Sequence, residues 1–283
     1  MKNAIITCTD NNFVEFVSEH WLKSLKENVD LTNIDIIILS YNLSKNNILK
    51  LEKHAKVIPC INNGHIAVIR YRDLATFLKN NIYDQIMFVD GGDILFQENI
   101  SEIFQENKQS YRAVCEDLEP PFTMYVNKWF NKEDANKIKH FLKGKKMING
   151  GMLVASHEMF RNLCQKCNSM IKEKCFGPDQ LAVNYIIHNS NFKELPAKYN
   201  FVLTTAKHPF KIKKGKFYLH ENELIPIVHN AGGKSFFRPV KNFGYGEKCN
   251  KFRPIRYYVL RITYKSITEL REMYKRINYF FKV

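Results

Sequence analysis

Two carboxylates separated by two glycines, Asp90 and Asp93, are the side chains best suited to chemistry in this chain. They follow residues 85–89, a short apolar run typical of a buried strand. Carboxylates avoid an apolar interior unless they are paired or bind a metal ion. Mn²⁺ and Mg²⁺ prefer carboxylate oxygens and often share them with phosphates. The stretch therefore indicates a site for a divalent cation and a diphosphate. The alternative is a polar turn in which Asp90 or Asp93 caps the next element.

Two later stretches place amide and carboxylate side chains next to the predicted start of a strand and the predicted start of a helix. Asn149 precedes Gly150 and Gly151, which open an apolar strand, and glycines at such a point suggest close approach of a ligand to the backbone. Asp179 and Gln180 stand at the start of a predicted helix. Gln180 could point a neutral amide into a site from there, whereas helix capping is the simpler role for Asp179.

A third stretch ends a predicted strand with His229, followed by Gly232, Gly233 and Lys234. Histidine is a good ligand for Mn²⁺, and a lysine behind two glycines can reach a phosphate. A lone histidine is more often a satisfied structural residue, so this stretch alone does not establish a metal ligand.

Polar residues also follow the first predicted strand, residues 4–8. Thr7, Thr9 and Asp10 lie where open α/β sheets commonly bind ligands, although Thr9 or Asp10 could instead cap the next helix. Arg72 lies in a helix that leads into the Asp90 strand. Its forked donor group could reach a phosphate, and an ordinary solvated arginine is the alternative.

The elements that must position these residues alternate along the chain, which predicts an α/β fold with a central, mostly parallel sheet flanked by helices. Strands are predicted at residues 4–8, 35–40, 57–60, 85–89 and 112–115, with two more beginning at Gly150 and ending at His229. Helices are predicted at residues 13–25, 46–54, 64–80 and 100–105, after Ser156 and from Gly177.

Composition narrows the classes of partner. The 283 residues carry a formal net charge of +15, which implies an anionic partner such as nucleic acid, a phosphate-bearing substrate or acidic lipid. The seven cysteines are scattered and are expected to be reduced thiols in a cytoplasm. The amino end is too short and polar for an export signal, and no apolar run approaches the length of a membrane span.

The carboxyl end differs from the rest. From residue 248 onward ten lysines and arginines stand against Glu269 and Glu272, a net charge of +8. Large apolar and aromatic residues interleave with them at helical spacing, which favours a helix lying on an anionic membrane surface. The alternatives are a helix packed on the main domain with a solvated basic side, and a nucleic-acid-binding arm.

Taken in order, these stretches resemble GT-A fold glycosyltransferases of the glycogenin/LgtC-like kind (glycosyltransferase family 8), over nearly all of residues 1 to 240. The Asp-x-x-Asp spacing of Asp90 and Asp93 is more similar to the glycosyltransferase domains of procollagen lysyl hydroxylases and collagen galactosyltransferases than to the usual Asp-x-Asp. Lys234 also lies one residue closer to His229 than the lysine of that family.

The resemblance implies that Asp90, Asp93 and His229 hold Mn²⁺ or Mg²⁺ against the diphosphate of a nucleotide sugar, with a UDP-sugar as the favoured donor. Lys234, with Gly232 in the same motif, would contact the diphosphate. The residues expected to bind the rest of the donor are Thr7, Thr9 and Asp10 at the base and ribose, Arg72 at the phosphates, and Asn149, Asp179 and Gln180 at the sugar. The family likeness also implies a retaining transfer.

These interpretations combine into a GT-A catalytic domain over residues 1–246 and a basic helical tail over residues 247–283. The expected role is to add a sugar to a lipopolysaccharide, capsular or other lipid-linked saccharide, from the cytoplasmic face of a bacterial membrane, with no nucleic acid as partner. One rival is a non-enzymatic basic protein that binds nucleic acid or membrane. Another is a sugar nucleotidyltransferase, although residues 7–20 lack the glycine-rich loop with lysine that such enzymes carry.

Overall fold

A seven-stranded sheet with the order β3-β2-β1-β4-β7-β6-β8 forms the centre of the computed structural model, which describes residues 1–118, 122–172, 175–232 and 235–280. The first four strands in that order run parallel, β7 is antiparallel to both of its neighbours, and β6 and β8 are parallel. The predicted α/β fold with a mostly parallel sheet is therefore confirmed. The strands are β1 (Asn3–Asp10), β2 (Ile34–Tyr41), β3 (Lys56–Cys60), β4 (Gln85–Val89), β6 (Tyr111–Ala113), β7 (Met152–Ser156) and β8 (Phe192–Glu194).

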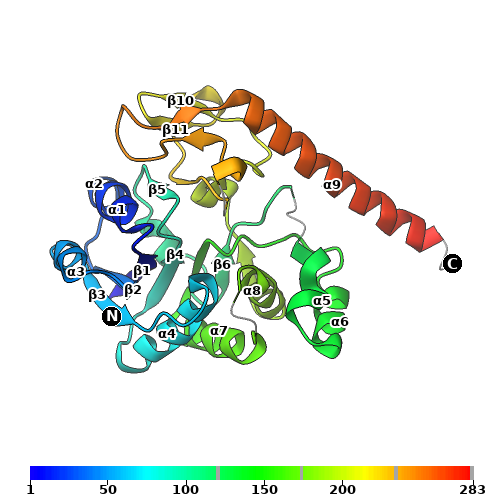
Figure 1. Cartoon of the computed structure of the whole chain (residues 1–283), viewed down its shortest axis with the longest axis horizontal. Helices are drawn as coiled ribbons and strands as arrows, with labels where there is room; N and C mark the ends of the chain where they lie inside the picture. Colours follow the sequence, from blue (N-terminus) through cyan, green and yellow to red (C-terminus); the bar gives the residue numbers. More distant parts are fainter. Residues whose placement is uncertain (119–121, 173–174, 233–234, 281–283) are drawn as a thin grey trace.

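Helices cover both faces of this sheet (Figure 1). Alternate residues of each strand enter opposite cores, because side chains alternate across a strand. In β4, Ile86 and Phe88 face α4, α7 and α8, while Met87 and Val89 face α1, α2 and α3. One side consists of α4 (Ile66–Asn80), α7 (His157–Met170) and α8 (Pro178–His188), extended by α5 (Val126–Trp129) and α6 (Lys132–Phe141), and the other of α1 (Val14–Phe16), the π-helical turn η1 (Val17–Trp21), α2 (Leu22–Asn28) and α3 (Lys45–Glu52).

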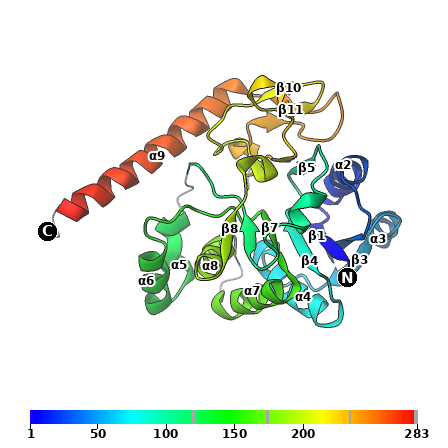
Figure 2. The ribbon, with the colours of Figure 1, turned by 180° about the vertical axis from the view of Figure 1, so that it is seen from behind.

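A smaller group of strands stands on one edge of the main sheet, as both views show (Figures 1 and 2). Its centre is a three-stranded sheet of order β5-β12-β9, accompanied by two short antiparallel pairs. A third apolar core, with Phe210, Phe217 and Tyr257, fills this part. The strands are β5 (Ile94–Phe96), β9 (Phe201–Val202), β10 (Lys211–Lys213), β11 (Lys216–Tyr218), β12 (Ile227–His229), β13 (Val240–Lys241) and β14 (Lys251–Phe252).

The helix predicted at residues 100–105 is wrong in type, because the chain forms a single 3₁₀ turn, η2 (Ser101–Phe104), there. Burial of Ile103 and Phe104 holds this turn against the body of the protein. The other 3₁₀ turns are η3 (Phe122–Tyr125), η4 (Ala197–Asn200), η5 (His220–Asn222) and η6 (Ser235–Phe237).

The carboxyl-terminal helix α9 (Pro254–Phe280) starts at the small sheets and extends away from the body (Figures 1 and 2). Its first turns bury Tyr257 and Leu260. The boundary expected after residue 246 does not coincide with a structural break, since β14 pairs with β13 across it. Within the described ranges, every helix is too short or too polar to span a bilayer.

His20 makes the contact between η1 and the small sheets sensitive to pH. The backbone N–H of Tyr245 donates to its Nδ1 over 3.1 Å, so that nitrogen must carry no proton. Burial lowers the pKa of His20 below the ordinary value of 6.5. In the unfolded chain His20 therefore takes up a proton first, and the stability of the fold should fall as pH drops below about 6.5.

We expect the midpoint of urea unfolding to fall between pH 7.5 and pH 5.5, and to fall less in a His20→Gln variant, whose amide oxygen can still accept from Tyr245. Equal pH dependence of the two midpoints would contradict this role of His20.

Candidate metal centre

Asp90, Asp93 and His229 meet because a strand of the main sheet leads directly into the small sheet. Asp90 follows the last residue of β4, and Asp93 precedes the first residue of β5. β5 pairs antiparallel with β12, with Ile94 opposite His229. The carbonyl of Asp93 also accepts a hydrogen bond of 2.9 Å from the backbone N–H of Asn230. The strand pairing thus brings two residues 136 positions apart to the same point.

One ligand atom from each of these three residues lies within 4.8 Å of the other two. Asp93 and His229 are buried, and Asp90 is partly exposed. Nε2 of His229 lies 3.4 Å from Oδ1 of Asp93. In the part of the chain that the structure describes, this is the one group of three or more such residues that could hold a metal ion. Two carboxylates and an imidazole suit Mn²⁺ well.

Glycine is required at two positions around the group, because neighbouring atoms occupy the space of a side chain. A Cβ on Gly151 would lie 2.4 Å from Cε1 of His229 and 3.0 Å from Oδ2 of Asp90. A Cβ on Gly91 would lie 2.7 Å from the carbonyl oxygen of Cys8 and from Oγ1 of Thr7. Any larger residue at these two positions would push the ligand side chains or β1 away.

Arg70 neutralises the acidic residues on one side of the group. It projects from α4, and its guanidinium lies 2.5 Å from Oδ1 of Asp90 and 3.5 Å from Oδ2 of Asp179. The side chain is only 6% exposed and its guanidinium carbon lies 5.0 Å from the centre of the Phe88 ring. A buried charge of this kind persists only when it is paired.

Arg72, the arginine expected at the phosphates, is engaged elsewhere. It bonds both carboxylate oxygens of Asp73, at 2.8 Å, and the carbonyl oxygen of Ile61, also at 2.8 Å. The two arginines lie two positions apart, about 200° around a helix, so Arg72 points away from the direction in which Arg70 reaches Asp90. Arg70 therefore replaces it as the arginine of this site.

Asp179, near the amino end of α8, has an incomplete set of partners. It is buried, and burial raises the pKa of its carboxyl to about 6 despite the nearby Arg70. Its Oδ1 has no hydrogen-bond partner among the described residues. Buried polar atoms normally have partners, so a missing donor suggests that a ligand supplies one.

Arg238 is the cation on the other side of the group. Its Nη2 lies 3.1 Å from Oδ2 of Asp93, and its Nε donates to the carbonyl oxygen of Gly232 over 2.9 Å. Gly232 has φ of +146°, and a Cβ there would meet the side chains of Phe237 and Arg238. Lys234, expected at the diphosphate, lies outside the described residues.

Asp93 and His229 each favour the charged form of the other. Burial alone would raise the pKa of Asp93, but His229 and Arg238 outweigh it and hold that pKa below its usual value. Burial alone would lower the pKa of His229, but the Asp93 carboxylate outweighs it and the pKa lies above its usual value. A metal ion bound at Nε2 of His229 would displace this proton.

A chain of hydrogen bonds determines which nitrogen of His229 faces the group. The backbone N–H of Gly151 can only donate, and it donates to Oδ1 of Asn149 over 2.9 Å. Nδ2 of Asn200 donates to the same oxygen over 2.9 Å. Oδ1 of Asn200 must then accept from Nδ1 of His229, at 3.0 Å. Nδ1 therefore carries a proton, and Nε2 is left as the atom that can bind a metal.

Glu116 holds the far end of this chain. Nδ2 of Asn149 donates to its Oε1 over 2.5 Å, and the hydroxyl of Thr205 donates to its Oε2. Glu116 is buried, and burial raises its pKa. Sequence patterns did not point to Asn200, because it acts only through residues that are distant in the chain.

Asn149 and Gln180, expected at a sugar, instead make bonds that shape the loop before β7. Oε1 of Gln180 accepts from the backbone N–H of Gly150 over 3.2 Å, and its Nε2 donates to the carbonyl oxygen of Ile148. The amide of Asn149 takes part in the hydrogen-bond chain described above. Both residues therefore shape the loop that carries Gly151.

The residues after β1 lie at the same edge of the sheet. Thr7 is fully buried against Gly91, and its hydroxyl has no partner among the described residues. Thr9 donates to the carbonyl oxygen of Asp10, and Asp10 accepts from the backbone N–H of Asn12 over 2.9 Å. Asp10 thus closes a turn before α1 and does not cap that helix, whose first turn has no side-chain cap. Of these three residues, Thr7 is the one that lies against Gly91.

No protein-family model matches this chain, and no curated protein matches it at a significant level.

The hydrogen-bond chain predicts that Asn200→Ala weakens Mn²⁺ binding by about 10–100-fold, the usual effect of removing a residue that orients a metal-binding histidine. The cause is loss of the acceptor for Nδ1 of His229. Calorimetric titration with Mn²⁺ measures it. Asn189→Ala, which removes an exposed amide at the end of α8, is the matched control. Unchanged Mn²⁺ affinity in a folded Asn200→Ala protein would show that the chain does not orient His229.

Proposed function

We propose that this protein is a metal-dependent glycosyltransferase with a GT-A fold, which moves a sugar from a nucleotide-diphosphate sugar to a glycan acceptor, with retention of configuration. The observation that carries the proposal is the meeting of Asp90, Asp93 and His229 at the carboxyl edge of a mostly parallel sheet. Ligands of open α/β folds bind at this edge. A UDP-sugar is the donor that the sequence resemblance favours.

The chemistry requires stabilisation of a diphosphate that gains negative charge as its bond to the sugar breaks. Asp90, Asp93 and Nε2 of His229 would hold Mn²⁺ or Mg²⁺, which supplies Lewis-acid stabilisation of that charge. Arg238, which lies 3.1 Å from Asp93, is available to contact a phosphate oxygen. Arg70 pairs with Asp90 and Asp179 from the opposite side and orients their carboxylates. Lys234 remains a further candidate for the diphosphate.

Asp179 is the residue best suited to hold the sugar. Its unpaired, buried Oδ1 needs a donor, and a sugar hydroxyl would supply one. The unpartnered hydroxyl of Thr7 offers a similar contact to another part of the donor. Asn149 and Gln180 contribute by holding the loop that carries Gly151. Thr9 and Asp10 remain candidates for the base and ribose, whereas Arg72, expected at the phosphates, is bonded to Asp73 and Ile61.

A non-enzymatic basic protein would have no need for this arrangement. Two carboxylates and a histidine gathered in a buried or partly buried region, with the histidine oriented by a hydrogen-bond chain, are costly to maintain in a fold. A binding surface for nucleic acid or membrane requires only exposed basic residues. A sugar nucleotidyltransferase remains a second enzymatic candidate, and the assay below distinguishes the two by their products.

The acceptor side of the proposal is a lipid-linked saccharide at an anionic membrane, contacted through α9. The inner face of α9 packs on the body through Tyr257 and Leu260, while an opposite face leaves large apolar side chains exposed. At about 100° per residue, their positions fall on one side of a helix, although the row is interrupted between residues 262 and 270. They are Ile255, Tyr258, Val259, Ile262, Leu270 and Met273, and they are called the outer stripe below.

The reaction is tested with purified protein, Mn²⁺ and a panel of nucleotide sugars. We expect release of nucleoside diphosphate from one donor, and a decrease of at least about 100-fold in Asp93→Asn, because a metal ion contributes several kcal/mol to stabilising the developing charge. Asp30→Asn, an exposed change, is the control. Failure of every donor to react, with and without added saccharide acceptors, would reject the transferase. Release of pyrophosphate from a nucleoside triphosphate and a sugar phosphate would identify the nucleotidyltransferase.

Membrane contact is tested by sedimentation with phosphatidylglycerol-containing and pure phosphatidylcholine vesicles. We expect binding to the anionic vesicles only, weakened by salt. The double variant Ile262→Asn, Leu270→Asn should bind at least about tenfold more weakly, because burying one such side chain contributes roughly 1.5–3 kcal/mol. Leu49→Asn, equally exposed on α3, is the control. Equal binding by all three proteins would exclude the outer stripe as the contact.

A further inference from the structure

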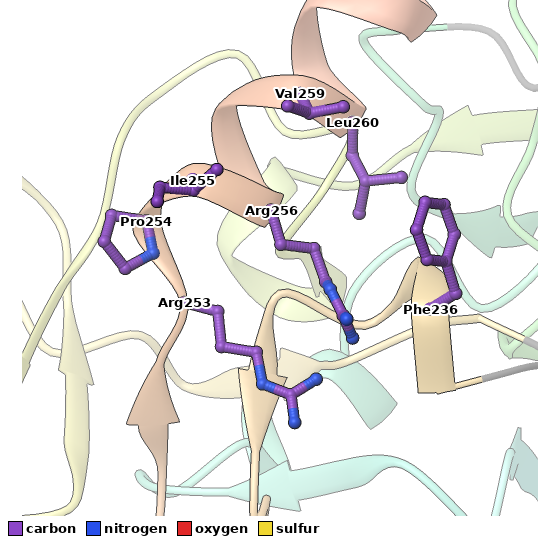
Figure 3. A pocket seen from close by; sticks show the side chains of 7 residues that line it. All are labelled: Phe236, Arg253, Pro254, Ile255, Arg256, Val259 and Leu260. Carbon is purple, nitrogen blue, oxygen red and sulfur yellow. The ribbon is translucent and has the colours of Figure 1, made fainter.

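A groove of about 440 Å³ lies where α9 leaves the body. One wall is Phe236 of η6, and the other is formed by residues 253–260 at the start of α9 (Figure 3). Figure 3 shows the side chains of Arg253 and Arg256 toward one end of the groove, and Ile255 and Val259 toward the other. The groove therefore combines a cationic end with an apolar end.

The exposure of these side chains is unusual for a surface without a ligand. Phe236 is 56% exposed, Ile255 81% and Val259 50%. The guanidinium carbon of Arg256 lies 5.3 Å from the centre of the Phe236 ring, which holds a positive charge over the apolar wall. Exposed apolar groups gathered beside arginines match a ligand that has an anionic head and an apolar body.

We propose that the groove binds one membrane phospholipid with a net negative headgroup. Its phosphate lies at Arg253 and Arg256, and the first part of an acyl chain lies along Ile255 and Val259. Arginine is the side chain best suited to phosphate, because its donors form a fixed fork. The net charge of +15 adds a general attraction to anionic lipid.

The position of the groove relative to the outer stripe, and relative to the candidate metal centre, supports a lipid as the occupant. Ile255 and Val259 belong both to the groove and to the outer stripe, so a lipid could pass from a bilayer under α9 into the groove without leaving an apolar surface. This part of the argument rests on the proposed membrane contact. The groove also adjoins the candidate site, because Phe236 lies two residues before Arg238, which bonds Asp93. A bound lipid would therefore contact the segment that carries the cation of the site.

The test uses a soluble lipid, so that binding in the groove is separated from adsorption to a bilayer. Dihexanoyl-phosphatidylglycerol, kept below its micelle concentration, is titrated into the full chain by calorimetry. We expect saturable binding with one lipid per chain, weakened by about tenfold in Arg253→Gln and in Val259→Asn, since each removes a contact worth roughly 1.4 kcal/mol or more. Dihexanoyl-phosphatidylcholine and inorganic phosphate should each bind more weakly than the anionic lipid.

Two matched variants on α9 make the test specific. Lys265→Gln removes an exposed charge and Ile262→Asn an exposed apolar side chain, both outside the groove, and neither should change binding of the soluble lipid. Equal weakening by Lys265→Gln and Arg253→Gln, absence of saturation, or phosphate binding as tight as the lipid would each overturn the proposal. So would a dimer in light scattering that Val259→Asn dissociates. Nucleoside diphosphate release, measured without lipid or acceptor, should be unaffected by Arg253→Gln and Lys265→Gln, so failure of the groove and of the transferase are distinguishable.

Discussion

Three carboxylates in or near a buried region impose the main constraint on this structure. Asp90, Asp93 and Asp179 would repel one another at low dielectric without compensation. Arg70 lies between Asp90 and Asp179, and Arg238 with His229 neutralises Asp93. α4 supplies Arg70 and the segment after β12 supplies Arg238, so the placement of both segments is tied to these carboxylates. The same requirement makes the region receptive to a divalent ion.

The site depends on two sheets meeting at a fixed register. β4 delivers Asp90 as part of the main sheet, whereas the pairing of β5 with β12 delivers Asp93 and His229. Asn149 and Asn200 then join the loop before β7 to His229. The backbone N–H of Gly151 can only donate, and this fixes the donor and acceptor atoms of Asn149 and Asn200 in turn. The orientation of the imidazole is therefore set before any ligand binds. Preorganisation of this kind is what an electrostatic catalyst needs.

Local sequence patterns were sufficient to predict most of the strands and to single out the three candidate metal ligands. Residues 85–89 form a strand as predicted, because an apolar run between polar residues has few other solutions. The choice between Arg70 and Arg72 required the rotation of α4 against the sheet, which periodicity alone does not give. Asn200 and Arg238 carried no signal, since their partners are 29 and 145 residues away. Gln180 was expected in the site, but the backbone of Gly150 and Ile148 takes up its amide.

The two glycines between Asp90 and Asp93 have a consequence for how this chain can vary. The segment is held at both ends by strands, and it fits against Cys8 and the ring of Phe13 with no space for a side chain. Its length is therefore as constrained as its composition. An inserted or deleted residue would rotate β5 by one pleat and turn Asp93 away from His229. Length variation should thus be rejected here, which makes the Asp-x-x-Asp spacing a geometric property of this fold.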